Sequence, residues 1–172
     1  MTRDLWKLRE TPVHSRTSAL CQSRNWRRWA GYMVAGSYEL GHEREYYSIR
    51  SSAGLIDVSP LFKYRISGRG AATLLDRVVT RDVSGCAVGQ VMYTPWCDAA
   101  GKVIDDGTLA RLDETTFRLT AADPTLLWLE DNSRGLDVEI EDVSDSTAAL
   151  ALQGPAAREI LQQIADADLG SL

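Results

Sequence analysis

Apolar and polar residues alternate most clearly in the central part of the chain. In residues 62–67 every second residue is apolar, which predicts a half-buried strand. Two apolar runs, 91–97 and 103–112, flank a short linker that contains Gly101, and this pattern predicts a β-hairpin. Residues 117–120 have the composition of the next strand. The pattern therefore predicts a sheet in which sequence neighbours pair.

Other segments have apolar residues at helical spacing. Residues 71–80 predict a short amphipathic helix against the sheet, and residues 39–52 predict a more polar helix that Gly54 ends. Asp123 and Pro124 are expected to serve as the N-cap and first residue of a helix that ends near 133–135. A last helix is expected after the turn at Gln153-Gly-Pro155; its apolar residues are Ile160, Leu161 and Ile164.

The two ends of the chain complete the predicted architecture. Residues 1–36 show little periodicity and predict an arm or irregular cap with at most one short helical turn. Alternation around 138–140 and 148–152 predicts two more strands. The order of elements favours an α+β fold, a largely antiparallel sheet with helices packed on one face. We expect residues 1–50 to form an arm and first helix, and 51–172 to form the core.

Composition and charge exclude several classes of function. The chain is 44% apolar and 25% charged, which is typical of a globular protein. Residues 1–50 hold nine Lys/Arg against five Asp/Glu, and the remainder holds ten against nineteen. An acidic body argues against nucleic-acid binding, although Arg24–Trp29 mixes basic and aromatic residues. Because no apolar run is long enough to span a bilayer or form a signal peptide, we expect no membrane association and a cytoplasmic location.

The cysteines and histidines do not predict a metal site. Cys21, Cys86 and Cys97 lack metal-ligand spacing and are expected to be reduced and structural. His14 and His42 are far from them in sequence. Zinc binding and a Ser-His-Asp triad are therefore not expected.

Asp105 and Asp106 stand side by side inside the second apolar run, where an ionised carboxylate needs a partner. Because successive strand side chains point to opposite faces, the two carboxylates should have different roles. We expect one to face a ligand pocket and the other to brace backbone or meet water. Gly107, which weakens a strand, is explained if a ligand approaches the backbone there. The structural alternative is a strand end at which the aspartates cap a turn.

Several motifs occur together, in order, across residues 29–165. The pieces are Trp29-Ala-Gly-Tyr32, Glu45-Tyr-Tyr-Ser-Ile-Arg50, Gly54-Leu-Ile-Asp-Val-Ser59, Met92-Tyr93, Gly101-Lys-Val-Ile-Asp-Asp106 and Ala149-Leu-Ala-Leu-Gln-Gly-Pro155. With these motifs the chain resembles the N-terminal portion of the folate-dependent aminomethyltransferase family, the glycine cleavage system T-protein and its relatives. The resemblance implies the folate-binding fold of that family, truncated at its C-terminal end.

The resemblance also implies a tetrahydrofolate site and a role for each matching residue. Asp106 would be the catalytic carboxylate, accepting a hydrogen bond from N10 and orienting N5 as the nucleophile. Met92 and Tyr93 would line the pterin pocket, where an aromatic face can stack on the ring; for Tyr93 the alternative is a buried hairpin aromatic. Thr120 would take the place of a pocket asparagine. The implied reaction moves a one-carbon unit from a lipoyl-carrying protein to tetrahydrofolate.

Three departures from the T-protein pattern widen the range of functions. Pro60-Leu61 replaces His-Met, Gly107 replaces a leucine, and Thr120 replaces the asparagine. They leave room for demethylation of a small amine or a methoxylated aromatic. A non-catalytic folate-binding module and a partner-binding domain without ligand are further alternatives. Because family members continue beyond the matching region, we expect the isolated chain to be inactive.

Overall fold

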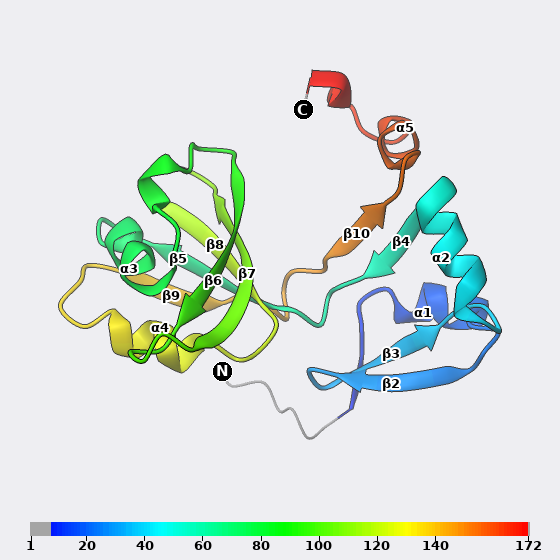
Figure 1. Cartoon of the computed structure of the whole chain (residues 1–172), viewed down its shortest axis with the longest axis horizontal. Helices are drawn as coiled ribbons and strands as arrows, with labels where there is room; N and C mark the ends of the chain where they lie inside the picture. Colours follow the sequence, from blue (N-terminus) through cyan, green and yellow to red (C-terminus); the bar gives the residue numbers. More distant parts are fainter. Residues whose placement is uncertain (1–7, 172) are drawn as a thin grey trace. The chain divides into compact units, whose positions relative to one another are not determined.

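The computed structural model describes residues 8–171, and this part of the chain divides into two compact units (Figure 1). One unit is Leu61–Thr147. The other combines the described residues before Leu61 with those from Ala148 onward. The chain thus leaves the second unit at Leu61 and returns to it at Ala148.

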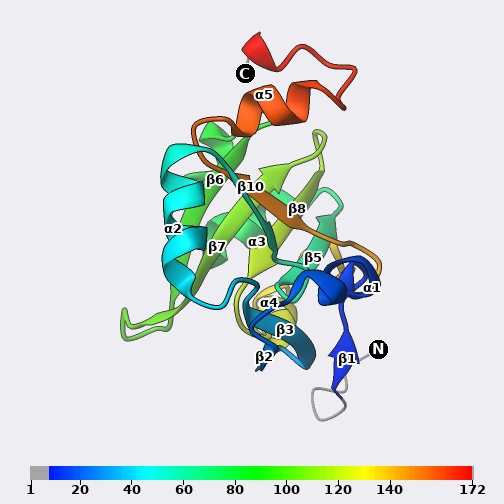
Figure 2. The same ribbon diagram turned by 90° about the vertical axis from the view of Figure 1, so that its right-hand side faces the viewer.

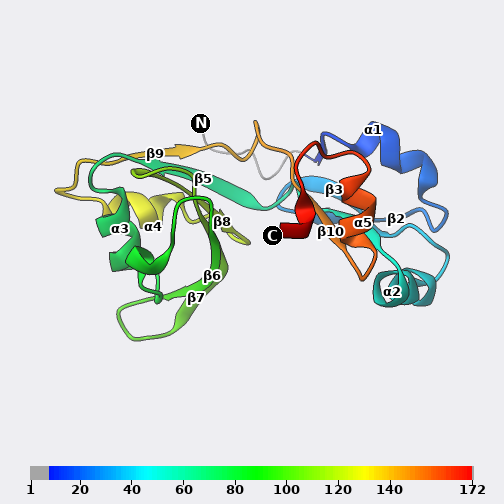
Figure 3. The same cartoon turned by 90° about the horizontal axis from the view of Figure 1, so that it is seen from above.

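The Leu61–Thr147 unit is built on a five-stranded sheet in which every neighbouring pair is antiparallel. The order is β6-β7-β8-β5-β9, and the strands are β5 (Phe62–Ser67), β6 (Val91–Cys97), β7 (Val103–Arg111), β8 (Thr116–Ala121) and β9 (Glu139–Asp142). Helices α3 (Ala71–Val78) and α4 (Leu126–Asn132) lie on the same side of this sheet (Figure 3). A 3₁₀ turn spans Val83–Gly85.

The side of the sheet that α3 and α4 cover holds the core of this unit. Alternate residues of each central strand point to that side. The buried strand residues include Tyr64, Ile66, Trp96, Leu109, Phe117 and Leu119, and those of the helices include Leu74, Leu75 and Leu129. Helix α3 brings its leucines to the sheet because they recur at helical spacing. The opposite side of the sheet carries the polar residues of the same strands.

The second unit contains two small sheets and short helices (Figure 2). In the first sheet, β3 (Tyr32–Ser37) pairs in parallel with β1 (Arg9–Glu10) and antiparallel with β2 (Asn25–Trp29). In the second, β4 (Gly54–Asp57) pairs antiparallel with β10 (Leu150–Gln153). The helices are α1 (His14–Thr17), α2 (His42–Ser51) and α5 (Ala157–Gln162), with 3₁₀ turns over Ser18–Leu20 and Leu169–Ser171.

The prediction of an irregular cap over residues 1–36 is wrong for the described part, which contains a β-hairpin. Strands β2 and β3 are joined by Ala30 and Gly31, whose φ angles are 47° and 84°. Positive φ at both central residues is the geometry of a tight hairpin turn. The pattern did not reveal β2 because Arg27 and Arg28 are consecutive and interrupt the alternation. Residues 1–7 of the predicted arm lie outside the described residues.

Two predicted helix boundaries are also corrected. Helix α2 ends at Ser51, and Gly54 begins β4 instead of ending the helix. Helix α4 begins at Leu126 with Thr125 as its N-cap residue. Asp123 lies two residues before this N-cap, in the preceding turn, where its backbone N–H donates to the Asp105 carboxylate, 2.9 Å away.

The α+β fold with an antiparallel sheet and helices on one face is confirmed. The strand predicted over 148–152, however, does not join the main sheet. It forms β10 and pairs with β4, and next to this pair the Ala149 N–H donates to Ser59 Oγ at 3.1 Å. Because β10 returns to β4, the two units do not coincide with the predicted segments 1–50 and 51–172.

Candidate functional site

The predicted hairpin forms β6 and β7, and its turn is held by one carboxylate. Asp98 Oδ1 accepts hydrogen bonds from the backbone N–H groups of Ala100 and Lys102, each at 2.9 Å. Gly101 adopts a φ of 78°, which favours glycine. The turn fixes the register that sets which side chains of β7 point to each side of the sheet.

Asp105 is a buried structural residue. Its Oδ1 accepts from the Asp106 N–H at 2.8 Å, and its Oδ2 accepts from Ala122 N–H at 3.0 Å and Asp123 N–H at 2.9 Å. A carboxylate with three backbone donors is well stabilised at a buried position. The expectation that one aspartate of the pair braces backbone is therefore confirmed, and Asp105 is that residue.

Asp106 lies on the side of the sheet opposite the helices, together with Tyr93, Thr108 and Thr120. Tyr93 pairs with Thr108, and Thr108 pairs with Thr120, so these three residues form one row across β6, β7 and β8. Asp106 is two residues before Thr108 and is exposed. We call the side that carries these residues the polar sheet face. It brings together three of the four residues that the sequence predicted for a folate site.

Tyr93 and Asp106 interact on this face. The pKa of the Tyr93 phenol is raised above its ordinary value, mainly because its hydroxyl hydrogen-bonds to the Asp106 carboxylate, with further contributions from partial desolvation and the negative charge. Tyr93 is 57% exposed, so the alternative of a buried hairpin aromatic does not hold. An aromatic ring beside a carboxylate on an open sheet surface can stack on a flat ligand and accept a hydrogen bond from it.

Met92 is not part of this group. It pairs with the buried Leu109, and its neighbour Tyr93 belongs to the polar sheet face. Because side chains alternate along a strand, Met92 points to the side of the helices. The sequence motif joined Met92 and Tyr93 as neighbours, whereas the sheet separates them.

The presence of glycine at position 107 has a structural reason that the sequence did not reveal. A Cβ at this position would overlap the backbone oxygen of Thr120 and would lie 3.4 Å from the Trp96 ring. Strand β8 and the core therefore occupy the space that a side chain would need. The expectation that a ligand approaches Gly107 is replaced by this close packing between strands.

Three cations also lie on the polar sheet face, and none of them was predicted as a site residue. Lys63 pairs with Thr120, and Arg65 pairs with Arg118, so all of these side chains lie on this face. Lys63 is buried, and its Nζ donates to the Leu61 carbonyl at 2.9 Å. The alternation in 62–67 was a sufficient signal, because it already places Lys63 and Arg65 on the side away from the apolar residues.

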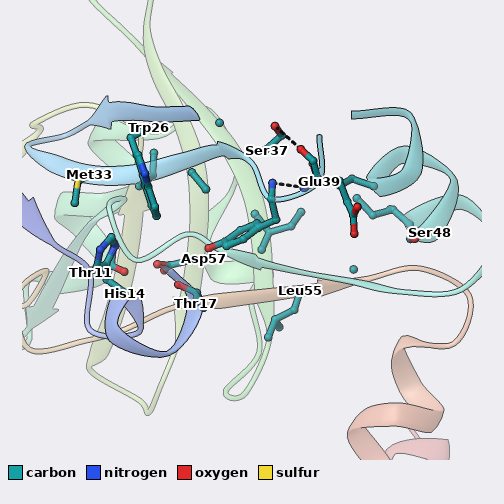
Figure 4. Close-up of a pocket in the computed structure, with 18 residues that line it drawn as sticks. Thr11, His14, Thr17, Trp26, Met33, Ser37, Glu39, Ser48, Leu55 and Asp57 are labelled. Carbon is teal, nitrogen blue, oxygen red and sulfur yellow. Dashed lines mark hydrogen bonds between the residues drawn. The ribbon is translucent and has the colours of Figure 1, made fainter. Parts of the chain in front are cut away.

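The second unit contains a cavity of about 410 Å³ (Figure 4). Trp26, Thr11 and His14 lie at one end, Glu39 and Ser48 lie at the other, and Asp57 of β4 lies between them. The His14 ring packs against Trp26 with 5.0 Å between centroids. Glu45 Oε1, which also lines the cavity, accepts from the Glu39 N–H at 3.1 Å. None of the residues predicted for the folate site lines this cavity.

Metal ligands, cysteines and membrane-spanning helices were also considered for the described residues. Residues 8–171 contain no group of three or more His, Cys, Asp or Glu side chains arranged to hold a metal ion. Cys21 and Cys86 are buried, and Cys97 is partly buried; all three are free thiols. The helices of the described chain are too short or too polar to cross a bilayer.

Comparison with solved structures defines the fold. The glycine cleavage system aminomethyltransferase T from Bartonella henselae superposes with a TM-score of 0.82 and 25% identity, over 91% of this chain and 44% of that protein. A chain of the heterotetrameric sarcosine oxidase from Corynebacterium sp. U-96 gives a TM-score of 0.56 at 22% identity, over 94% of this chain and 69% of that one, and supports the fold alone. The fold is therefore that of the glycine cleavage aminomethyltransferases.

Comparison of sequences gives the family. The model of the GCVT N-terminal domain matches residues 13–171, and the chain belongs to this family. An aminomethyltransferase of Clostridium botulinum (strain Loch Maree / Type A3) is 39% identical over 145 residues, which are 82% of this chain and 39% of that protein. One of Thermoanaerobacter sp. (strain X514) is 37% identical over 132 residues, 74% of this chain and 36% of that protein. The chain thus spans about two fifths of the relatives it matches.

Proposed function

We propose that this chain supplies the N-terminal part of a tetrahydrofolate-dependent aminomethyltransferase of the glycine cleavage type. The observation that carries the proposal is the exposed Asp106 carboxylate beside the Tyr93 ring on the polar sheet face. It is supported by membership of a family whose curated relatives are aminomethyltransferases. The one-carbon donor would be presented by a lipoyl-carrying protein, and the location would be the cytoplasm.

The residues of the polar sheet face suit a reduced pterin. Asp106 is acceptor-only when ionised, so its oxygens can take a hydrogen bond from an N–H at N10 of the ligand. The Tyr93 ring is open to one side and can stack on a flat heterocycle. Thr120 and Thr108 add hydroxyl groups in the next strands. Together they would hold the ligand in one orientation on a rigid sheet.

Tetrahydrofolate, when bound, would supply the nucleophilic nitrogen, and the protein would supply orientation and charge. Asp106 would orient that nitrogen, N5, by accepting a hydrogen bond from the N–H at N10. It would take the proton from N5 as the new bond from N5 to the methylene carbon forms, while the bond from that carbon to the amino group breaks and ammonia leaves. Tyr93 would keep the Asp106 carboxylate in place through its hydroxyl. Asp105 would hold the strand end through its three backbone hydrogen bonds.

An NMR titration of the chain with tetrahydrofolate tests the proposal. A protein of 172 residues is small enough for backbone assignment, and the method detects weak binding. We expect shift changes centred on the amides of Tyr93, Asp106, Thr108 and Thr120. Asp106→Asn should weaken binding by about tenfold because a charged acceptor is lost. Asp131→Asn, on the exposed surface of α4, is the matched control.

The result can contradict the proposal in two ways. Shift changes confined to the cavity of the second unit would assign the ligand to a different site. Equal affinity of the wild type and the Asp106→Asn variant would remove the role of Asp106. A folate-binding module without catalysis would bind in the same way, so turnover of a one-carbon donor by the longer polypeptide that contains this domain separates the two functions.

A further inference from the structure

Arg118 is an unpaired cation on the polar sheet face. It lies in β8, is partly buried, and has no hydrogen-bond or ion-pair acceptor among residues 8–171. The arginines nearby in sequence differ in this respect: Arg111 Nη1 donates to the Cys86 carbonyl at 3.0 Å, and Arg134 pairs with Asp131. A guanidinium has five N–H donors and keeps its charge, so partial burial without an acceptor is costly.

The register makes the position of Arg118 less favourable still. Arg118 pairs directly with Arg65 of β5, and like charges opposite each other destabilise a sheet. Arg65 is neutralised on its other side by Glu141 of β9, whose Oε2 accepts from Arg65 Nε at 3.0 Å. Glu141 therefore pairs with Arg65, and the positive charge of Arg118 has no carboxylate partner among residues 8–171. An anion bound at Arg118 would remove this repulsion.

The sheet also fixes how far Arg118 is from Asp106. Arg118 pairs with Ala110 of β7, which is four residues beyond Asp106 on the same strand and the same side. At a rise of about 3.4 Å per residue, Ala110 and the neighbouring Arg118 are about 14 Å from Asp106 along the strand. The row of Tyr93, Thr108 and Thr120 lies between them. A ligand that contacts both ends must be extended, with a negative group at the end away from Asp106.

We propose that Arg118 is a carboxylate-binding residue on the polar sheet face, for a ligand whose other end lies at Asp106. This inference rests on the proposed function. The guanidinium group matches a carboxylate through two parallel hydrogen bonds, which gives direction as well as charge. Two sources supply the same chemistry: the glutamate tail of tetrahydrofolate, and a carboxylate on the one-carbon donor. In either case Arg118 sets specificity, and Asp106 remains the residue at the reacting end.

Binding of paired probes to the wild type and to Arg118→Gln tests the inference. Tetrahydrofolate is compared with 6-methyltetrahydropterin, which lacks the benzoylglutamate, and benzoate is compared with benzamide, which lacks the charge. Dissociation constants come from anaerobic NMR titrations. We expect Arg118→Gln to weaken binding of each carboxylate-bearing probe by about tenfold or more and to leave the affinity for the uncharged probe unchanged. Arg69→Gln, an exposed arginine paired with Asp137, is the matched control.

The probes separate the two sources of the carboxylate. Weaker binding of tetrahydrofolate with unchanged binding of the pterin assigns Arg118 to the folate tail. Weaker binding of benzoate with unchanged binding of tetrahydrofolate assigns it to the donor. Arg118→Lys keeps the charge but loses the paired geometry, and it should bind with intermediate affinity.

Equal affinities of wild type and Arg118→Gln for every carboxylate probe overturn the inference. If the pterin still binds near Asp106 in that case, the proposed function stands and only the role of Arg118 fails. If the wild type binds none of the probes, both fail. Loss of folding does not confuse the result, because removing one of two opposed arginines should leave stability unchanged or higher, which a thermal melt of the variant checks.

Discussion

Asp105 and Asp106 are identical in chemistry and adjacent in sequence, yet they have opposite environments. Asp105 is 8% exposed and accepts three backbone hydrogen bonds, whereas Asp106 is exposed and interacts with the Tyr93 phenol. The alternation of a strand is the physical cause, since one residue of the pair must point to each side. At this scale the same substitution therefore has different consequences at the two positions.

Asp105→Asn should lower the free energy of unfolding by about 2 to 3 kcal/mol. The asparagine keeps one acceptor oxygen, but its NH₂ group then faces backbone N–H donors and leaves them without an acceptor. Asp106→Asn is the matched control and should change stability little, because its side chain is exposed. Urea unfolding followed by circular dichroism measures both variants. Equal loss of stability in the two would show that the Asp105 hydrogen bonds are not what holds the strand end.

The Tyr93 phenol should titrate at lower pH once the Asp106 charge is removed by Asp106→Asn. The carboxylate raises the Tyr93 pKa above 10.0, so the protonated phenol is favoured in the folded state. The contribution of the Tyr93–Asp106 interaction to stability is present below pH 10.0, and it is lost as the pH rises through the folded-state pKa of Tyr93. Ultraviolet titration of tyrosinate, taken as the difference from Tyr93→Phe in each background, isolates this residue among the six tyrosines. A Tyr93 titration curve that is the same with and without the Asp106 carboxylate contradicts the interaction.

At the scale of elements, the β6-β7 hairpin and β8 determine where the polar residues lie. Register pairs Tyr93 with Thr108 and Thr108 with Thr120, three residues that are far apart in sequence. The hairpin itself was predictable, because two apolar runs flank a turn that contains Gly101. The pairing of β8 with β7 agrees with the prediction that sequence neighbours pair, but its pairing with β5 on the other side was not predictable, because strand order depends on which edges meet in the folded chain.

Gly107→Ala should destabilise the sheet by about 3 kcal/mol, because the added Cβ would overlap the Thr120 carbonyl oxygen and the strands would have to separate. Gly85→Ala is the matched control. A Cβ at Gly85 has no neighbour within 4 Å, so this variant should be neutral or slightly stabilising. Urea midpoints of the two variants are compared with the wild type. Equal midpoints for Gly107→Ala and the wild type would show that β7 and β8 are less closely packed.

At the scale of the whole molecule, the two units differ in how much core they contain. Most of the large buried side chains, including Trp96, Tyr64, Phe117 and Leu109, belong to the Leu61–Thr147 unit, whereas the second unit buries few, such as Tyr32. In the second unit the strands β4 and β10 form a two-stranded sheet, and Leu55 and Leu150 are 59% and 50% exposed. A two-stranded sheet with little buried apolar surface has low stability.

Amide hydrogen exchange should therefore be slow in one unit and fast in the other. We expect the amides of β5, β7 and β8 to exchange through global unfolding of their unit, and those of β4 and β10 to exchange through local opening. Mass spectrometry of peptides from the intact chain measures both. Equal protection of β4 and β8 would show that the chain unfolds as one cooperative unit.

The sequence by itself determined the local features of this protein. Two apolar runs around Gly101 predicted the hairpin, and alternation predicted the strand at 62–67. Alternation also placed Asp105 and Asp106 on opposite sides, because the period of a strand is a property of the backbone. The motifs of Gly54–Ser59, Gly101–Asp106 and Ala149–Pro155, which occur in this order, together indicated the family to which the chain belongs. The hairpin of β2 and β3 escaped prediction because its consecutive arginines hide the alternation.

Only the tertiary structure decided which distant residues share a surface. It paired β10 with β4 instead of with the main sheet, and it set Arg118 opposite Arg65. It also showed that position 107 needs a glycine because β8, and not a ligand, lies close to its backbone. These outcomes depend on pairing between strands that are remote in sequence, and the free energy of that pairing comes from packing and register, which no local pattern contains.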